Sequence, residues 1–312
     1  MVSYDILWNK MKKAKVPPLF IDLLKFWYRN QMNHVNWAGT LSESYRLECG
    51  LRQGGLTSPT LFNLYIDSLI EELSKQHVGC HIDGICLNNL SYADDMALLS
   101  PSIGGLRKLL RICEEYACRH GLKYNINKSQ YMVFHAAGGR TPKQVPEILL
   151  NRIALSRVEE FKYLGHIVTV DLRDDKDIER ERRALSKRAN MLARRFARCS
   201  VEVKLTLFRE AFCTSLYTCA LWAKYYKKGY NALTVQYNNA FRAMLGLPRY
   251  CSASGMFAAA RTDGFQATIR KRCASLVRRV RDSSNTVLAM IASRVDCPFV
   301  HHCCSMHVTR SA

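Results

Sequence analysis

Two adjacent carboxylates stand inside an apolar run at residues 89–100, NLSYADDMALLS. One interpretation of Asp94 and Asp95 is a hairpin turn, because aspartate hydrogen-bonds nearby backbone and tolerates unusual backbone angles. The other is a metal site, because two like charges held together on a half-buried hairpin repel unless a cation lies between them. The choice between these two interpretations depends on the rest of the sequence.

The elements that would position this pair are predicted by hydrophobic periodicity and by turn residues. Helices are expected at 4–15, 17–30, 58–76 and 105–120, and Ser58 followed by Pro59 resembles a helix N-cap with proline at the first helical position. Hairpins or strands are expected around 33–49, 89–99, 130–135, 152–158 and 161–170. The alternation of strands with packed helices up to residue 170 predicts an α+β layer domain.

Residues 171–250 show helical periodicity almost throughout and predict a helical domain. The segment begins with the acidic DLRDDKDIERE and turns basic at RRALSKRANMLARRFAR, an order that suits a helix macrodipole. A third segment, 251–312, is expected to be helical to about Ser293 and irregular beyond it.

Charge is unevenly spread along the chain, whose formal net charge is +20. Residues 1–150 hold 17 basic and 13 acidic residues, and residues 151–312 hold 29 and 13. This surplus favours a polyanionic partner, with nucleic acid before an acidic membrane surface, and a solvated basic helical surface is the alternative. Seven basic residues on the first predicted helix of the basic segment could follow a phosphate backbone: Arg182, Arg183, Lys187, Arg188, Arg194, Arg195 and Arg198.

The composition fits a globular protein of the nucleus or cytoplasm rather than a secreted or membrane protein. No run reaches the roughly 18 apolar residues of a membrane span, and the N-terminus lacks the basic-then-apolar order of a signal peptide. The 13 cysteines are odd in number and follow no framework, so we expect reduced thiols. The cysteines and histidines of CPFVHHCCSMH, residues 297–307, are crowded without a Cys-x-x-Cys pair, which favours an irregular tail over a zinc site.

Four strings, taken in order, resemble the reverse transcriptase of non-LTR (LINE-type) retrotransposons. They are GLRQGGLTSPTLFNLYIDSL at 50–69, YADD at 92–95, GLKYNINKS at 121–129 and FKYLGH at 161–166. The similarity continues through the helical region, so it implies partial polymerase fingers and palm at 1–170, a thumb at 171–250 and a C-terminal extension at 251–312. In that context the adjacent aspartates favour metal binding over a simple turn.

The resemblance implies RNA-templated DNA synthesis, in which two Mg²⁺ (or Mn²⁺) ions about 4 Å apart assist phosphoryl transfer. Asp94 would bind both ions and Asp95 would be an auxiliary ligand. Lys128 corresponds to a family lysine near the leaving pyrophosphate, although a surface lysine is the alternative. The implied partners are an RNA template, a DNA primer and dNTPs.

Further positions are implied to contact substrates. The nucleotide-binding positions would be Arg52, Gln53, Gly54, Tyr92 and Ala93. The primer and template positions would be Phe161, Tyr163, Leu164, Gly165, Arg183, Lys187, Arg194 and Arg195. A flexible linker before a capped helix is the alternative for Arg52, Gln53 and Gly54, and an apolar core strand is the alternative for 161–166.

One part of the family pattern is not found in these 312 residues. Relatives carry a strand of the type F-x-D-F-x-K-A-F-D-x-V, whose first aspartate is the third metal ligand, and VSYDILW matches the family residues at the end of that strand and directly after it. We therefore expect an N-terminally truncated reverse transcriptase that is inactive alone. A retroelement remnant that binds nucleic acid without catalysis and an RNA-binding maturase-like intron protein are the alternatives.

Overall fold

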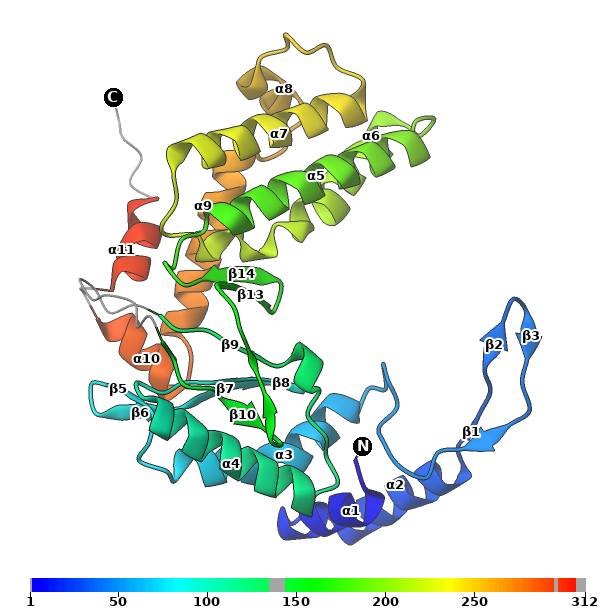
Figure 1. Cartoon of the computed structure of the whole chain (residues 1–312). Coiled ribbons are helices and arrows are strands. Elements are labelled where there is room, and N and C mark those ends of the chain that lie inside the picture. Colours follow the sequence, from blue (N-terminus) through cyan, green and yellow to red (C-terminus); the bar gives the residue numbers. More distant parts are fainter. Residues whose placement is uncertain (1, 135–143, 295–296, 307–312) are drawn as a thin grey trace. The chain divides into compact units, whose positions relative to one another are not determined.

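A computed structural model describes residues 2–134, 144–294 and 297–306, which form an α+β structure of two compact units (Figure 1). Unit 1 comprises Met1–Tyr131 and Pro142–Arg157, and unit 2 comprises Met132–Thr141 and Val158–Ala312. No helix in the part of the chain so described is long and apolar enough to cross a membrane.

The helices of unit 1 follow the apolar periodicity of the sequence. They are α1 (Tyr4–Lys13), α2 (Pro18–Asn30), α3 (Ser58–Ser74), α4 (Ile103–Arg119) and the 3-10 turn η1 (Ile126–Lys128). Helix α1 ends before Lys15, which has φ 58°, and Pro17 is the N-cap of α2 with Pro18 as the first helical residue. The predicted helices at 58–76 and 105–120 are confirmed to within two residues at each end.

The predicted N-cap of α3 is wrong by one residue. Thr57 takes the N-cap position without a capping hydrogen bond, so Ser58 is the first helical residue and Pro59 the second. The Ser58 hydroxyl donates instead to the carbonyl of Arg52 at 2.7 Å, which ties the helix start back to the preceding loop.

Every sheet within the described residues has two strands. In unit 1 the antiparallel pairs are β1–β4 (Met32–Asn33 with Tyr45–Arg46), β2–β3 (Asn36–Trp37 with Thr40–Leu41), β5–β6 (Cys80–Ile82 with Ile85–Leu87), β7–β8 (Asn89–Tyr92 with Asp95–Leu98) and β10–β11 (Leu149–Leu150 with Ile153–Ala154). The remaining pair, β9 (Gln130–Tyr131) with β12 (Ser156–Arg157), is parallel. The predicted strands at 130–135 and 152–158 are thus shorter than expected, and residue 135 lies outside the described residues.

Three hydrophobic clusters hold unit 1 together. One joins α1, α2 and the first half of α3, and the second joins the rest of α3 to α4 and β8. The third packs Leu110, Ile148 and Leu150 against Leu98 of β8 and Ile126 of η1. Strand β8 and η1 are therefore fixed on a common apolar support.

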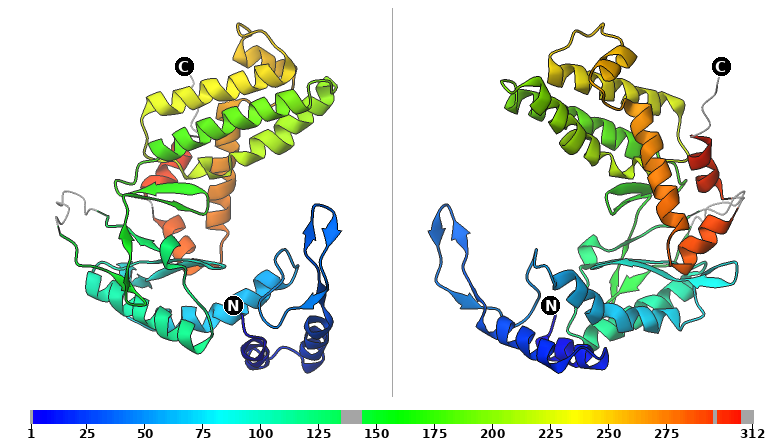
Figure 2. Two further views of the ribbon diagram at one scale, coloured as in Figure 1. Left: turned by 45° about the vertical axis from the view of Figure 1, so that its right-hand side comes forward. Right: turned by 180° about the vertical axis from the view of Figure 1, so that it is seen from behind.

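Unit 2 consists of one hairpin and a helical body (Figure 2). The hairpin is β13 (Glu160–Tyr163) with β14 (His166–Thr169). The helices are α5 (Asp175–Arg195), α6 (Val201–Leu207), the π-helical segment η2 (Phe208–Phe212), the 3-10 turns η3 (Cys213–Ser215) and η4 (Tyr217–Leu221), α7 (Lys227–Leu245), α8 (Ala253–Ala259), α9 (Phe265–Arg281), α10 (Thr286–Ser293) and α11 (Pro298–Ser305). Both views of Figure 2 show α5 and α7 side by side. Tyr237 and Phe241 of α7 pack with Phe208 and Phe212 of η2 in an aromatic core.

The tail differs from the sequence expectation. Helix α11 occupies Pro298–Ser305, where we expected irregular chain, because the buried side chain of Cys303 contacts the core of unit 2 at the Ala220 carbonyl. A helix of eight residues is marginal in isolation, so this packing accounts for its formation. His307 of the suspected Cys/His cluster lies outside the described residues.

Candidate active-site hairpin and nucleic-acid interface

The Asp94–Asp95 pair lies at the tip of the β7–β8 hairpin. Tyr92 pairs with Asp95, so Ala93 and Asp94 form a two-residue turn. Ala93 has φ 53°, and a positive φ at the first central residue is typical of a type II′ turn, which normally takes glycine there. Alanine in this region costs on the order of 1 kcal/mol, and such strain is found most often at functional sites.

Both aspartates face solvent. Asp94 and Asp95 are exposed, and Tyr92 is 66% exposed, whereas Met96 and Leu98 of the same hairpin pack on the apolar clusters of unit 1. The hairpin is half-buried as expected, since it buries the stem of β8 and leaves its tip, with the two aspartates, in water. No group of three or more Asp, Glu, His or Cys side chains within the described residues is arranged to hold a metal ion.

The Gly-rich loop before α3 is a compact turn rather than an open linker. The carbonyl of Arg52 accepts hydrogen bonds from the Gly55 N–H at 3.0 Å and from Ser58 at 2.7 Å. A Cβ on Gly55 would lie 2.6 Å from the Ser58 hydroxyl, so this glycine is needed for the turn to close. The turn presents the side chains of Arg52 and Gln53 to solvent, as the nucleotide-binding hypothesis requires.

Lys128 ends the short 3-10 turn η1, and its side chain is exposed. The side chain of Asn125 caps this turn by accepting from the Lys128 N–H at 3.3 Å. Because η1 and β8 share an apolar support, Lys128 belongs to the same rigid part of unit 1 as the hairpin of Asp95.

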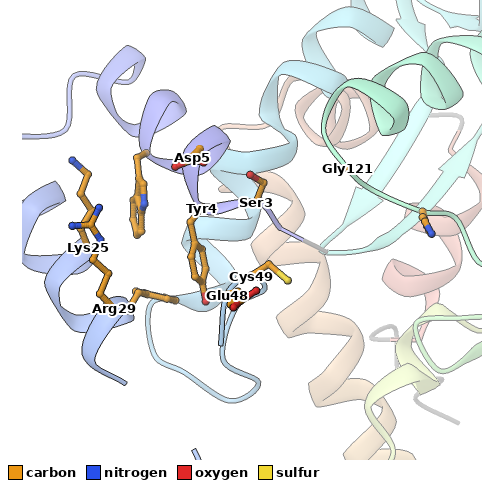
Figure 3. Close-up of a pocket in the computed structure, with 11 residues that line it drawn as sticks. Ser3, Tyr4, Asp5, Lys25, Arg29, Glu48, Cys49 and Gly121 are labelled. Carbon is orange, nitrogen blue, oxygen red and sulfur yellow. The ribbon is translucent and has the colours of Figure 1, made fainter. Parts of the chain in front are cut away.

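A hollow in unit 1 contains none of the predicted site residues (Figure 3). Its volume is about 790 Å³, and its walls are Ser3, Tyr4, Asp5, Trp8, Lys25, Tyr28, Arg29, Glu48, Cys49, Gly121 and Lys123. The Tyr4 ring extends toward Glu48 and Cys49, while Lys25 and Arg29 project from α2. The Tyr4 hydroxyl is buried without a hydrogen-bond partner in the described structure, and burial raises the pKa of that phenol.

The second predicted hairpin, β13–β14, lies in unit 2. Leu164 and Gly165 form its two-residue turn with φ 46° and 88°, the pattern of a type I′ turn. The Tyr217 hydroxyl donates to the Leu164 carbonyl at 3.1 Å and would lie 1.6 Å from a Cβ on Gly165. Gly165 is thus explained here by the approach of Tyr217, while Phe161 and Tyr163 lie on the same strand with ring centroids 6.5 Å apart.

A buried ionic network joins this hairpin to α5. His166 lies with Nε2 3.3 Å from Asp174 and Nδ1 3.1 Å from Asp177, which is fully buried. Burial alone would lower the pKa of His166, but the two carboxylates outweigh it and raise this pKa to about 9. Asp177 also accepts from the Ile167 N–H at 3.0 Å and from the Trp222 indole at 2.8 Å. Burial would raise the pKa of Asp177, but His166, Arg180 and the Trp222 indole hold it below its ordinary value.

The network continues along α5 through Arg180, Glu181 and Arg188. Arg180 contacts Asp177 at 2.7 Å and Glu181 at 3.1 Å, and Arg188 contacts Glu181 at 2.8 Å. Sequence reasoning assigned the acidic start of α5 to the macrodipole and Arg188 to the phosphate-binding face. The sequence signal for the burial of these carboxylates is their helical spacing, because Asp177 and Glu181 lie on the same face of α5 as the buried Leu185.

The exposed surface of α5 carries cations: Arg183, Lys187 and Arg194 lie opposite the buried face, and Arg195 lies at its flank. Lys187, Arg194 and Arg195 are exposed and form no ion pair within the described residues, and Arg183 is exposed while paired with Glu179 at 2.8 Å. Arg182 holds the pKa of Glu179 down to about 2, with Arg183 contributing. Of the predicted cationic positions, these four retain a solvent-facing charge on one helix.

Comparison with known proteins decides the family. The sequence pattern of the reverse transcriptase (RNA-dependent DNA polymerase) family matches residues 1–168, more than half of the chain. The chain belongs to the reverse transcriptase family. The resemblance to retrotransposon polymerases drawn from the four sequence strings is confirmed, and the match includes both the YADD hairpin and the Gly-rich loop.

Relatives of this reverse transcriptase are proteins of non-LTR retrotransposons. It is 28% identical to the Pol polyprotein of the type-2 retrotransposable element R2DM of Drosophila melanogaster, over 53% of this chain and 16% of the relative. It is 26% identical to the RNA-directed DNA polymerase from mobile element jockey of Drosophila funebris, over 53% and 18%. It is 22% identical to the probable RNA-directed DNA polymerase from transposon X-element of Drosophila melanogaster, over 70% of this chain and 25% of the relative. The chain therefore spans a quarter or less of the length of these relatives.

Proposed function

We propose that this chain contributes the catalytic hairpin and part of the nucleic-acid path of an enzyme that performs RNA-templated DNA synthesis in retrotransposition. The observation that carries the proposal is the family match over residues 1–168, which includes the Asp94–Asp95 hairpin. Unit 1 would supply palm and part of the fingers, and unit 2 would supply the thumb and a C-terminal extension.

Asp94 and Asp95 would hold divalent metal ions, Mg²⁺ or Mn²⁺. The donor set fits, because two carboxylates stand next to each other at the tip of a tight turn and are exposed to solvent. Mg²⁺ prefers hard oxygen ligands and keeps waters or substrate phosphates in its remaining positions. Two ions bound there would stabilise the attacking and leaving oxygens of nucleotidyl transfer.

The residues around the hairpin would bind the incoming dNTP. The exposed Arg52 offers guanidinium donors to phosphate, and Gln53 offers an amide to sugar or base. Gly54, with φ 75° and open space where a Cβ would be, lets backbone approach the nucleotide. Tyr92 and Ala93 would lie against the nucleotide at the primer end, and Lys128 would place positive charge near the leaving pyrophosphate.

Unit 2 would follow the primer and template. The turn Leu164–Gly165, with Phe161 and Tyr163 on its strand, would contact the primer. The exposed Arg183, Lys187, Arg194 and Arg195 of α5 would contact phosphates, since cations along one helix face can track a nucleic-acid backbone. Binding through such contacts weakens steeply as salt rises.

We further propose that a polypeptide of these 312 residues binds nucleic acid but does not polymerise by itself. The family pattern pairs the YADD carboxylates with a third aspartate, and two adjacent carboxylates are a weak cage for two hard cations. A retroelement remnant that binds RNA or DNA without catalysis would share this nucleic-acid binding and would lack metal binding at the hairpin.

The test combines Mn²⁺ binding, followed by electron paramagnetic resonance, with primer extension on an RNA template. We expect weak Mn²⁺ binding that Asp94→Asn reduces at least about tenfold, because one of two anionic ligands is lost. The control is Glu43→Gln, which removes one exposed carboxylate elsewhere in unit 1. Equal Mn²⁺ binding by both variants would exclude the metal site and favour the remnant. Template-dependent incorporation that Asp94→Asn abolishes would overturn the proposed inactivity while supporting the catalytic role.

A further inference from the structure

A second hollow lies in unit 2, on the face where η4 packs against α9. Its volume is about 250 Å³, and its seven lining residues are Tyr217, Ala220, Leu221, Arg272, Ser275, Leu276 and Arg279. None of these seven is acidic and two are arginines, so the hollow is positively charged. Neither the predicted site residues nor the cationic face of α5 belongs to it.

The two arginines are placed to hold one anionic group. Arg272 and Arg279 are seven residues apart on α9, about two helical turns, so both lie on the same face. Arg272 Nη2 donates to the Cys213 carbonyl at 2.9 Å, which fixes the guanidinium and leaves its other N–H groups for a ligand. Arg279 is exposed and forms no ion pair within the described residues. Guanidinium groups match the oxygen geometry of phosphate closely.

The opposite wall is apolar and fixed in position. Tyr217 is 59% exposed and Leu221 is 44% exposed, so both side chains offer apolar surface to a ligand in the hollow. The hydrogen bond from Tyr217 to the Leu164 carbonyl holds the ring under the turn of β13–β14. A ring held in advance loses little entropy on binding, so it is a suitable stacking surface for a base or sugar.

We propose that this hollow holds one nucleotide unit of a nucleic-acid strand, with its phosphate on Arg272 and Arg279 and its sugar or base against Tyr217 and Leu221. The proposal rests on the proposed function and deepens it, because it assigns a discrete phosphate-and-stacking site beside the predicted primer-binding turn. An arginine pair alone would suit any anion, and the exposed ring next to it selects a nucleotide.

The experiment measures binding of a fluorescein-labelled RNA–DNA heteroduplex with a single-stranded extension to the full chain at three salt concentrations. We expect Arg279→Gln to weaken binding about three- to tenfold and to lower the salt slope by about one, as loss of one phosphate contact does. The matched control is Arg278→Gln, which removes the same charge from the neighbouring exposed position outside the hollow. Equal effects of the two variants would show a general charge effect and overturn the site.

Photo-crosslinking with 5-iodouracil in the strand tests the stacking wall. We expect crosslinked peptides that contain Tyr217, which Arg279→Gln diminishes and Arg278→Gln leaves. Crosslinks confined to other segments would overturn the proposal. Competition by a dNTP or by inorganic phosphate at micromolar concentration would assign the hollow to free anions and would also overturn it.

A failure of the proposed nucleotide site can be distinguished from a failure of the proposed function. The triple substitution Lys187→Gln, Arg194→Gln and Arg195→Gln tests the cationic face of α5. Loss of heteroduplex binding in this triple variant, with Arg279→Gln equal to its control, would keep the proposed nucleic-acid path and remove the hollow from it. A chain that binds no heteroduplex at low salt would contradict both.

Discussion

At the scale of single residues, two of the nine non-glycine residues with positive φ in the described structure lie in the turns of hairpins predicted to do chemistry. Ala93 has φ 53° beside the aspartate pair, and Leu164 has φ 46° in the second hairpin. Non-glycine residues take such angles only when the surrounding structure fixes them. In the second hairpin, the contact of Tyr217 with the turn is what fixes them.

Gly165 gives a prediction at this scale. Substitution Gly165→Ala should lower the free energy of unfolding by about 2–4 kcal/mol, since alanine would be strained at φ 88° and its methyl group would overlap the Tyr217 hydroxyl. Urea unfolding followed by circular dichroism measures the change.

The control for this prediction is Gly246→Ala. Gly246 ends α7 with φ 69° but has open space where a Cβ would be, so only the backbone term of about 1 kcal/mol applies. Equal destabilisation by the two substitutions would contradict the role assigned to Tyr217.

At the scale of elements, α5 has two chemically distinct sides. Its buried side holds Asp177 and Glu181 in a network with His166 and two arginines, and its exposed side carries cations that face solvent. Removing one member of a buried network leaves its partners unpaired and is costly. The network therefore fixes β13–β14 on the helix whose other face is proposed to contact nucleic acid.

This network predicts a pH dependence. His166 has a pKa of about 9 in the folded chain and an ordinary value of 6.5, so its protonated form is favoured by folding. The resulting stabilisation is complete below pH 6.5 and is lost as the pH rises through 9, with a size of up to about 3 kcal/mol. Urea unfolding at pH 6.5, 8 and 9.5 should show this decline.

His166→Gln is the comparison for the pH experiment, because glutamine keeps hydrogen-bonding capacity but does not titrate. The wild-type chain should lose stability more steeply than this variant between pH 6.5 and 9.5. Parallel curves would show that other titrating groups account for the dependence. At acidic pH, the lowered pKa of Asp177 implies that the free energy of unfolding decreases as the pH falls through the folded-state pKa of this carboxyl. This decrease reports the same ion pair with His166.

The sequence allowed prediction of elements whose signals are local. Helices α3 and α4 follow from apolar spacing, and the β7–β8 hairpin follows from Asp94 and Asp95 between apolar runs. The spacing of Asp177 and Glu181 could indicate burial, but their partners could not be predicted, because Asp177 meets Trp222 45 residues along the chain. Helix α11 escaped prediction for the same reason, since it depends on packing of Cys303 rather than on periodicity.

At the scale of the whole molecule, the hydrophobic cores are separate. Each cluster of the described structure draws its residues from a single unit, with an aromatic core in unit 2 and three smaller clusters in unit 1. Units with their own cores can unfold independently.

We therefore expect two transitions in differential scanning calorimetry. Leu69→Ala should lower the transition temperature of unit 1 only, and Phe212→Ala that of unit 2 only. Each substitution leaves a cavity in one core and should lower the free energy of unfolding of that unit by about 2–5 kcal/mol. A single transition that both substitutions shift equally would mean that the two units unfold cooperatively.

Trp222 gives the molecule a natural optical probe. The other three tryptophans, at positions 8, 27 and 37, all belong to unit 1, and Trp222 is 2% exposed with its indole N–H on Asp177. In a chain whose other tryptophans are replaced by phenylalanine, the fluorescence of Trp222 would report the protonation state of Asp177. The same fluorescence would report the unfolding of unit 2 and any rearrangement of the ionic network when a nucleic-acid strand binds.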